Sequence, residues 1–351
     1  MINHDGLREK MRSNRSCFSG LFVIRFVLLC AVLITTIASA GLATAGNSSI
    51  SITHENDMFT GRDHYYTAGS SITWYGQRRR HIGIADQIAA ALPAFPSAGN
   101  RRLALSIGHK MYTAEDIEED NPPKDDRPYA GWAYLSSSLI VESGWRQSIA
   151  DISVGVVGPA AQGHEVQRAV HDQLDTSPEP QGWDHQLRDE AGVVGRYTDR
   201  YRARLMFGSG RGVHWGLDVI PGWTLWAGNV YTAAEVELIV RFGAGLPDDY
   251  GGPIYHPVTN PESFFRPNRG GWYVYARGVR RLVEHNIFLD GNTVRDSRET
   301  EKERYVNQLY AGIAFHGPRM RVSATYSMPE HEFVAQQEND PYWAMQASWA
   351  F

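Results

Sequence analysis

The dominant pattern along this chain is the alternation of apolar and polar residues with a period of two. In the last nine residues the apolar positions are Trp343, Met345, Ala347, Trp349 and Phe351. Segments 309–315 and 320–328 repeat the pattern, with one apolar face and one face of small or polar residues. A period of two is typical of β-strands, because successive side chains point to opposite sides of a sheet. The chain is therefore predicted to be all-β.

Alternation alone does not separate a soluble sandwich from a transmembrane barrel, since both have one apolar and one polar face. Most of the predicted strands are roughly 9 to 14 residues long, whereas strands of soluble sheets usually have about 5 to 6. Trp and Tyr residues stand at strand ends, as in membrane-interface belts. Charges of both signs lie on the polar faces: Arg196, Arg200, Arg202 and Arg204 in one strand, and Glu235, Glu237 and Arg241 in another. These features favour a transmembrane antiparallel β-barrel whose polar faces line an interior.

Twelve strands are predicted, an even number, as expected for a bacterial single-chain barrel. With both termini in the periplasm, every connection from an odd-numbered to an even-numbered strand is extracellular. Two periplasmic links, 78–100 and 244–270, are longer than such turns usually are. The strands cover residues 48–55, 67–76, 101–113, 126–143, 146–158, 190–207, 214–227, 231–243, 272–283, 306–315, 319–328 and 343–351.

Residues 1–45 are predicted to be a cleaved signal peptide, followed by one barrel domain over residues 46–351. Basic residues precede or interrupt the apolar run 18–37, which ends in small-residue sites at 38–40 and 43–45. A single membrane anchor is the alternative, because the run is long for a signal core. No second run of 18 apolar residues follows, so helical membrane spans are not expected.

Composition narrows the possible partners. Both cysteines, Cys17 and Cys30, lie in the predicted leader, so the exported chain has no disulfide and no thiolate metal site. The whole chain has 34 basic and 39 acidic residues, of which five and two lie in the leader, leaving 29 against 37. This negative balance does not suggest a nucleic-acid partner.

A polar hairpin tip follows the first predicted strand, and it contains Asn56 and Asp57. Such residues often occupy tips for turn geometry alone, so a solvated turn is the simplest interpretation. The count of odd and even strands, however, places this tip on the extracellular side of the membrane, together with the loops 114–124 and 159–189.

The third of these loops contains a predicted helix over residues 163–174. An apolar stripe runs along one side, and Gln167 and His171 lie one turn apart on a polar stripe. A plug helix resting on the barrel is the simplest interpretation. A zinc protease of the His-Glu-x-x-His type is not supported, because the residue four positions after His164 is Arg168 and not histidine. A serine hydrolase is not supported either, because the sequence has no Gly-x-Ser-x-Gly elbow.

Five motifs in order along the chain resemble the outer-membrane lipid A 3′-O-deacylases. Each motif is weak alone, but together they cover nearly the whole exported chain. They are Glu-Asn-Asp at 55–57, Tyr-Thr-Ala-Gly at 66–69, Asp-Arg-Pro-Tyr-Ala-Gly-Trp at 126–132, Gly-Val-Val-Gly-Pro at 155–159 with Glu-Val-Gln at 165–167 and His171, and Asn-Ile-Phe-Leu-Asp-Gly-Asn at 286–292.

The resemblance implies a twelve-stranded outer-membrane barrel with an active site between its wall and the loop helix. It also implies calcium-dependent hydrolysis that removes an ester-linked 3′-acyloxyacyl group from lipid A, the lipopolysaccharide anchor in the outer leaflet. A membrane-embedded monomer is expected. The functional positions of the family correspond here to Asn56, Asp57, Thr67, Gln167 and His171.

The chemistry of these residues suggests a role for each. His171 is expected to be the general base that activates water, with Gln167 orienting the water or the lipid. Asp57 and Asn56 are hard oxygen donors suited to Ca²⁺, and a cation beside Asn56 would stabilise the oxyanion. Thr67 is expected to position the substrate through its hydroxyl.

One departure from the family pattern bears on the substrate. The family carries a basic pair in the loop after the third strand, but here residues 115–121 are acidic. Lys124 and Arg127 are the nearest candidates to bind an anionic head group, although Arg127 is equally explained as half of an ion pair inside the barrel. Two alternatives therefore remain: hydrolysis of another phospholipid or glycolipid ester, and a non-enzymatic barrel that serves as a narrow pore or a binding surface.

Overall fold

The computed structural model describes residues 48–57, 65–92, 94–174, 179–207, 214–251, 258 and 269–351, and all their side chains except those of 84, 85, 88 and 171–174. The predicted signal peptide, residues 1–45, lies outside these ranges. No helix among the described residues is long and apolar enough to cross a membrane.

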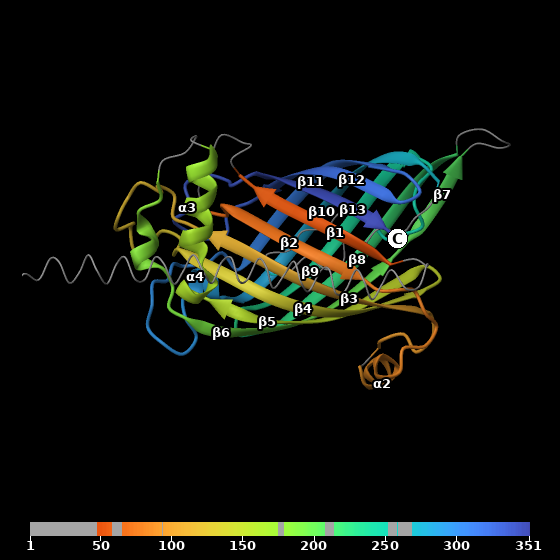
Figure 1. Ribbon diagram of the computed structural model, residues 1–351, viewed down its shortest axis with the longest axis horizontal. Helices are drawn as coiled ribbons and strands as arrows, with labels where there is room; N and C mark the ends of the chain where they lie inside the picture. Colours follow the sequence, from red (N-terminus) through yellow and green to blue (C-terminus); the bar gives the residue numbers. More distant parts are fainter. Residues whose placement is uncertain are drawn as a thin grey trace, which may run out of the picture. The chain divides into compact units, whose positions relative to one another are not determined.

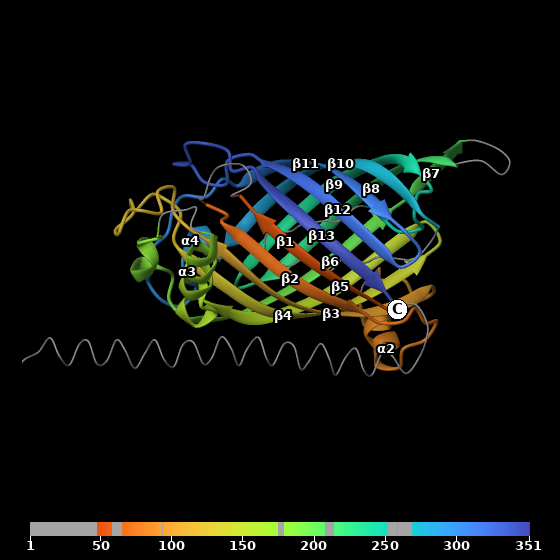
Figure 2. The ribbon, with the colours of Figure 1, turned by 45° about the horizontal axis from the view of Figure 1, so that its top comes forward.

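The strands form one closed antiparallel sheet (Figures 1 and 2). Apart from β6 and β7, each strand pairs with its sequence neighbours; β13 pairs with β1, and β6 pairs with β8, which closes the barrel. The strands are β1 (Ser49–Asn56), β2 (Ala68–Tyr75), β3 (Asn100–Tyr112), β4 (Ala130–Ser143), β5 (Arg146–Val157), β6 (Glu190–Tyr201), β7 (Ala203–Phe207), β8 (Trp215–Gly228), β9 (Tyr231–Ala244), β10 (Gly271–Asn286), β11 (Tyr305–His316), β12 (Met320–Pro329) and β13 (Tyr342–Ala350).

Two of the thirteen strands, β6 and β7, occupy a single position in the barrel. Both pair with β8, and the register continues across the gap: Arg200 lies opposite Gly222, and Ala203 lies opposite Val219. Arg202 lies between them, and its backbone N–H donates to the carbonyl of Trp145 at 2.7 Å. The barrel thus has twelve strand positions, which confirms the predicted architecture.

The fourth strand starts later than predicted, at Ala130 rather than at residue 126. The carboxylate of Asp126 accepts hydrogen bonds from the backbone N–H groups of Glu115 and Arg127, at 2.8 and 2.6 Å. Pro128 has no N–H to donate to a ladder. This segment is therefore a side-chain-stabilised loop.

The described residues contain two α-helices that the sequence analysis did not predict. Besides the predicted helix α3 (Gly163–Leu174), the long periplasmic link contains α2 (Ile84–Ala91), and α4 (Ile287–Asp290) forms one turn after β10. Ala89 of α2 packs with Phe95 against Leu139 and Val141 on β4. Eight residues are too few to give a clear helical period, so the sequence pattern did not indicate α2.

Polar side chains face the interior of the barrel and apolar side chains face outward, as predicted. On β9, Val236 and Leu238 are 61% and 48% exposed, whereas their neighbours Glu235 and Glu237 are 2% and 5% exposed. This is the reverse of a soluble sandwich, and it fits a barrel whose outer surface meets lipid.

Buried ion pairs fill the middle of the interior. Arg241 binds both Asp218 and Asp249. A second group joins Glu235 and Glu237 to three arginines, with nitrogen–oxygen distances of 2.6–2.7 Å: Arg200, Arg277 and Arg281. A narrow pore would have a solvated lumen, so this packing disfavours the pore alternative.

The orientation of the wall can be tested with Leu238→Arg, which places a charge on the apolar outer surface near the middle of β9. We expect a loss of about 2–4 kcal/mol in unfolding free energy measured by urea titration in lipid vesicles, the cost of Arg near the bilayer midplane. The control is Val294→Arg, at a 76% exposed position outside the strands. Equal and small effects of the two substitutions would show that the wall faces water.

Candidate active site

The candidate residues gather at one end of the barrel. Figures 1 and 2 show α3 and α4 at this end, while α2 and the C-terminus lie at the other. β1 ends and β2 begins at the α3 end, so the hairpin tip, the loop helix and the loop after β3 meet there, as strand parity predicted.

The described residues on both sides of the hairpin tip are buried. Asn56 is the last residue of β1, Asp57 follows it, and Thr67 directly precedes β2. Their exposed fractions are 7%, 0% and 3%. The hydroxyl of Thr67 is hydrogen bonded to that of Thr113 beyond β3, at 2.9 Å. The interpretation as a solvated turn is therefore wrong for these residues.

Asn56 belongs to the outer face of the wall. Along β1 the outward positions include Ile52, which is 55% exposed, and His54, and Asn56 follows at the same period. Asn56 lies opposite Ala68 on β2, and Ala68 lies opposite Met111 on β3. These three residues form a row on the side of the wall that meets lipid.

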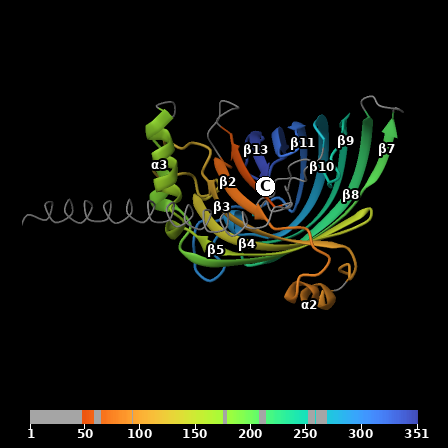
Figure 3. The same cartoon turned by 45° about the vertical axis from the view of Figure 1, so that its right-hand side comes forward.

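Helix α3 packs against this same face. Ala68 and Met111 form a cluster with Tyr129 and Trp183, and Val166 of α3 packs on it. Figure 3 shows α3 beside β2 and β3, outside the barrel. The helix is therefore no plug in the lumen. A surface of the outer wall and a helix enclose the candidate site between them.

Two glycines allow the close contact. A Cβ on Gly163, the first residue of α3, would lie 2.4 Å from the Trp183 ring. A Cβ on Gly131 of β4 would lie 3.0 Å from the Cβ of Ala161, just before the helix. Any larger residue at these positions would push α3 away from the wall.

Gln167 is directed into this buried contact. Its side chain is 1% exposed, and its Oε1 accepts a hydrogen bond from the indole N–H of Trp183 at 2.8 Å. Among the described residues its amide nitrogen has no hydrogen-bond partner. An unsatisfied buried donor is costly, and a water or a lipid oxygen would satisfy it.

The side chain of His171 lies outside the described residues, although its backbone belongs to α3. Residues four apart in a helix share a face, which puts His171 on the side of Gln167. The distance between His171 and Asp57 therefore stays a prediction.

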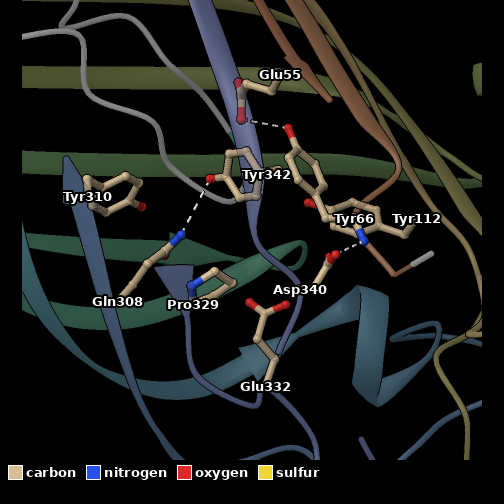
Figure 4. Close-up of a pocket in the computed structure, with 9 residues that line it drawn as sticks. All are labelled: Glu55, Tyr66, Tyr112, Gln308, Tyr310, Pro329, Glu332, Asp340 and Tyr342. Carbon is tan, nitrogen blue, oxygen red and sulfur yellow. Dashed lines mark hydrogen bonds between the residues drawn. The ribbon is translucent and has the colours of Figure 1, made fainter. Parts of the chain in front are cut away.

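A buried charged group supports the tip from inside the barrel. The hydroxyl of Tyr66 donates to Glu55 at 2.8 Å, and Lys110 lies 3.3 Å from Glu55 and 2.8 Å from the Tyr66 hydroxyl. The carboxylate of Asp340 accepts from the backbone N–H of Tyr66, also at 2.8 Å. Glu55 precedes Asn56 and Tyr66 precedes Thr67, so these bonds fix the backbone on both sides of the tip. Figure 4 shows Glu55, Tyr66 and Asp340 around a small cavity at this end of the lumen.

The fifth motif, residues 286–292, closes the mouth of the barrel next to the site. Phe288 of α4 stacks on Tyr112, with ring centroids 4.2 Å apart. Burial opposes ionisation of Asp290, but hydrogen bonds from His285 and Lys302 hold its pKa below the ordinary value. Asn292 exchanges two hydrogen bonds with the backbone of Arg188, downstream of Trp183. This motif is structural.

The two basic residues proposed to bind a head group differ in their surroundings. Arg127 is 2% exposed, pairs with Glu332 and lies over the ring of Tyr112, so it has the structure of an internal ion pair. Lys124 is exposed near the acidic segment, most of which is also exposed. Of these two residues, only Lys124 has a side chain that is accessible to a ligand.

The oxygen donors at the tip are of the chemical type that binds a hard cation. Asp57 and Asn56 supply one carboxylate and one amide oxygen, of the type that Ca²⁺ prefers. Within the described ranges no group of three or more His, Cys, Asp or Glu side chains is arranged to hold a metal. Backbone carbonyls, water or lipid oxygens would have to complete the six to eight ligands that Ca²⁺ usually takes.

Sequence reasoning missed three residues that shape the site: Glu55, Lys110 and Trp183. Glu55 is part of the Glu-Asn-Asp motif, but nothing in the sequence indicates its buried partners. A single Trp in a loop, such as Trp183, gives no periodic signal. Lys110 carried a usable signal, because a lysine on the lumen-facing side of a strand needs a buried acidic partner.

Comparison with known proteins gives the family and supports the fold. The family described as "Outer membrane protein LpxR" matches residues 26–351. The structure of LpxR from Salmonella typhimurium superimposes with a TM-score of 0.71 at 17% identity, covering 86% of this chain and all of that one. The β-domain of the Bordetella autotransporter BrkA gives a TM-score of 0.43 at 11% identity, covering 88% of this chain and 99% of that one. None of the curated proteins matches the sequence. The family resemblance expected from the motifs is confirmed, and the chain belongs to the LpxR family of outer-membrane proteins.

Proposed function

We propose that this protein is an outer-membrane carboxylic ester hydrolase that removes the 3′-acyloxyacyl group from lipid A. The observation that carries the proposal is the position of the site on the outer face of the wall, beneath α3. A lipid in the outer leaflet reaches this face without leaving the membrane. Membership of the LpxR family supports the same proposal.

In the proposed reaction His171 takes a proton from water as the water attacks the ester carbonyl. The tetrahedral intermediate then releases the sugar hydroxyl, which receives the proton, and the acyl group leaves as a carboxylic acid. The free amide N–H of Gln167 holds the water or the carbonyl oxygen in place. The Thr67 hydroxyl, fixed by Thr113, contacts the lipid.

Asp57 and Asn56 would hold Ca²⁺, which when bound supplies positive charge at the developing oxyanion. Burial supports this assignment, because a carboxylate that is 0% exposed binds a cation in a low dielectric, where the attraction is strong. The fixed backbone on both sides of the tip keeps the two oxygen donors in place.

A second candidate function is hydrolysis of another phospholipid or glycolipid ester. The acidic segment favours it, because Glu118, Glu119 and Asp120 are exposed beside the site and would repel a phosphorylated head group. Divalent cations that bridge these carboxylates to the phosphates would remove the repulsion.

The first prediction concerns the general base. His171→Ala should lower the rate of 3′-deacylation by about 10²–10⁴-fold, the usual contribution of a general base. Mass spectrometry of lipid A from cells that express each form measures the effect. Arg168→Ala is the matched control, since Arg168 is exposed on the same helix. The hydrolase proposal is wrong if lipid A keeps its 3′ chain with the intact protein as well.

Removal of calcium should abolish activity reversibly. Chelation is expected to stop deacylation by the purified protein in detergent, and added Ca²⁺ should restore it, because Asp57 and Asn56 alone cannot stabilise the oxyanion. Asp57→Asn should raise the Ca²⁺ concentration needed for half-maximal rate. Full activity in chelator would contradict the role of the metal.

The support beneath the tip gives a third prediction. Lys110→Met leaves Glu55 without its cationic partner, so it should cost about 3–5 kcal/mol of unfolding free energy and lower activity. Adding Glu55→Gln removes the uncompensated charge and should recover most of the stability in urea titrations. Additive losses in the double variant would show that the two residues do not act as a pair.

A further inference from the structure

A row of polar side chains interrupts the apolar outer wall directly below the candidate site. His54 on β1 lies opposite Ser70 on β2, and Ser70 lies opposite His109 on β3. All three occupy the outward period of their strands. The row starts one step along the wall from Asn56, toward the periplasm.

The rows on either side show that this polarity is local. The next row toward the periplasm consists of three isoleucines, Ile52, Ile72 and Ile107, which lie opposite one another in the same way. The row above contains Asn56, Ala68 and Met111. Polar groups on a lipid-facing wall cost free energy unless they are hydrogen bonded, so the row requires an explanation.

His109 has a structural explanation. Its Nε2 is hydrogen bonded to the carbonyl oxygen of Ala161 at 2.8 Å. Ala161 ends the short turn before α3, so this bond ties the start of the helix to the wall.

The other two residues form a pair with one unused group. The Nδ1 of His54 is hydrogen bonded to the hydroxyl of Ser70 at 2.9 Å, and both residues are exposed on the outer face. When the hydroxyl donates to Nδ1, the neutral ring carries its hydrogen on Nε2. Within the described part of the chain Nε2 has no hydrogen-bond partner. In this tautomer the pair presents one N–H donor to the lipid.

We propose that His54 and Ser70 form a subsite for the second ester of the acyloxyacyl group, with His54 Nε2–H donating to its carbonyl oxygen. An ester has acceptors and no donor, so it matches this group. The inference rests on the proposed function, because it assumes that the first ester lies at the level of Asn56.

The spacing of the rows agrees with the covalent structure of such a group. Residues two apart along a strand are separated by about 6.8 Å. The second ester is only a few covalent bonds from the first, within reach of the neighbouring row. The hydrocarbon that follows would then lie on Ile52, Ile72 and Ile107. The three rows would then contact the first ester, the second ester and the hydrocarbon, in the order in which these groups follow one another in the acyl group.

The subsite is tested with two synthetic lipids that differ only in the 3′ chain, one acyloxyacyl and one a simple saturated acyl group. His54→Phe keeps the ring but removes the donor, so the KM for the acyloxyacyl lipid should rise about tenfold, the worth of one hydrogen bond. The kcat for both lipids and the KM for the simple lipid should stay within twofold. His54→Gln, which restores an N–H donor, should recover most of the lost affinity.

Controls separate the subsite from other roles of the pair. Val236→Ala, on the outer face of β9 and not on the proposed path of the acyl group, should not change the ratio of the two KM values. Equal effects of His54→Phe on both lipids would overturn the proposal. So would loss of kcat on both lipids with Ser70→Ala, which would make Ser70 a nucleophile activated by His54.

A binding measurement keeps the subsite distinct from the proposed hydrolysis. With the His171→Ala protein, the acyloxyacyl lipid should bind more tightly than the simple lipid, and His54→Phe in that background should remove the preference. If the wild type fails to cleave either lipid but this preference is found, the hydrolase proposal falls and the subsite stands. Equal binding of both lipids to His171→Ala overturns the subsite.

Discussion

The alternation of side chains across the barrel wall is the constraint on which the rest of the structure depends. Because the outer surface meets lipid, charged groups must lie inside, where Arg241 and its two aspartates pair. The same constraint makes any outward polar residue conspicuous. Asn56, His54 and Ser70 are outward, polar and adjacent, and α3 lies beside them. The wall thus both forms the membrane span and presents the candidate site to the membrane.

The strands could be predicted because each one repeats a two-residue period for long enough to be distinct. The start of the fourth strand was predicted wrongly, because side-chain hydrogen bonds set the backbone conformation there. The carboxylate of Asp126 accepts hydrogen bonds from two backbone N–H groups, and the chain stays in a loop until β4 begins at Ala130. Helix α2 was not predicted from the sequence because it is short and depends on packing against Leu139 and Val141.

For the candidate site, strand parity predicted which loops meet, but not on which side of the wall they meet. The position of α3 depends on Gly131, Gly163 and the Trp183 cluster, whose contacts no local pattern encodes. The burial of Asp57 was likewise unpredictable, since a turn sequence does not show what covers it. The family motifs named the candidate residues, and the structure shows how those with described side chains are arranged.

The central claim is that the lipid is bound on the outside of the wall and not in the lumen. The most direct measurement is photo-crosslinking in the His171→Ala protein, with a photoreactive amino acid at Ile72, which faces outward, or at Ser71, which faces the lumen. We expect adducts with the 3′ acyl chain of lipid A at position 72, well above those at Val236 elsewhere on the wall, and none at position 71. Adducts at position 71 in place of 72 would contradict this claim.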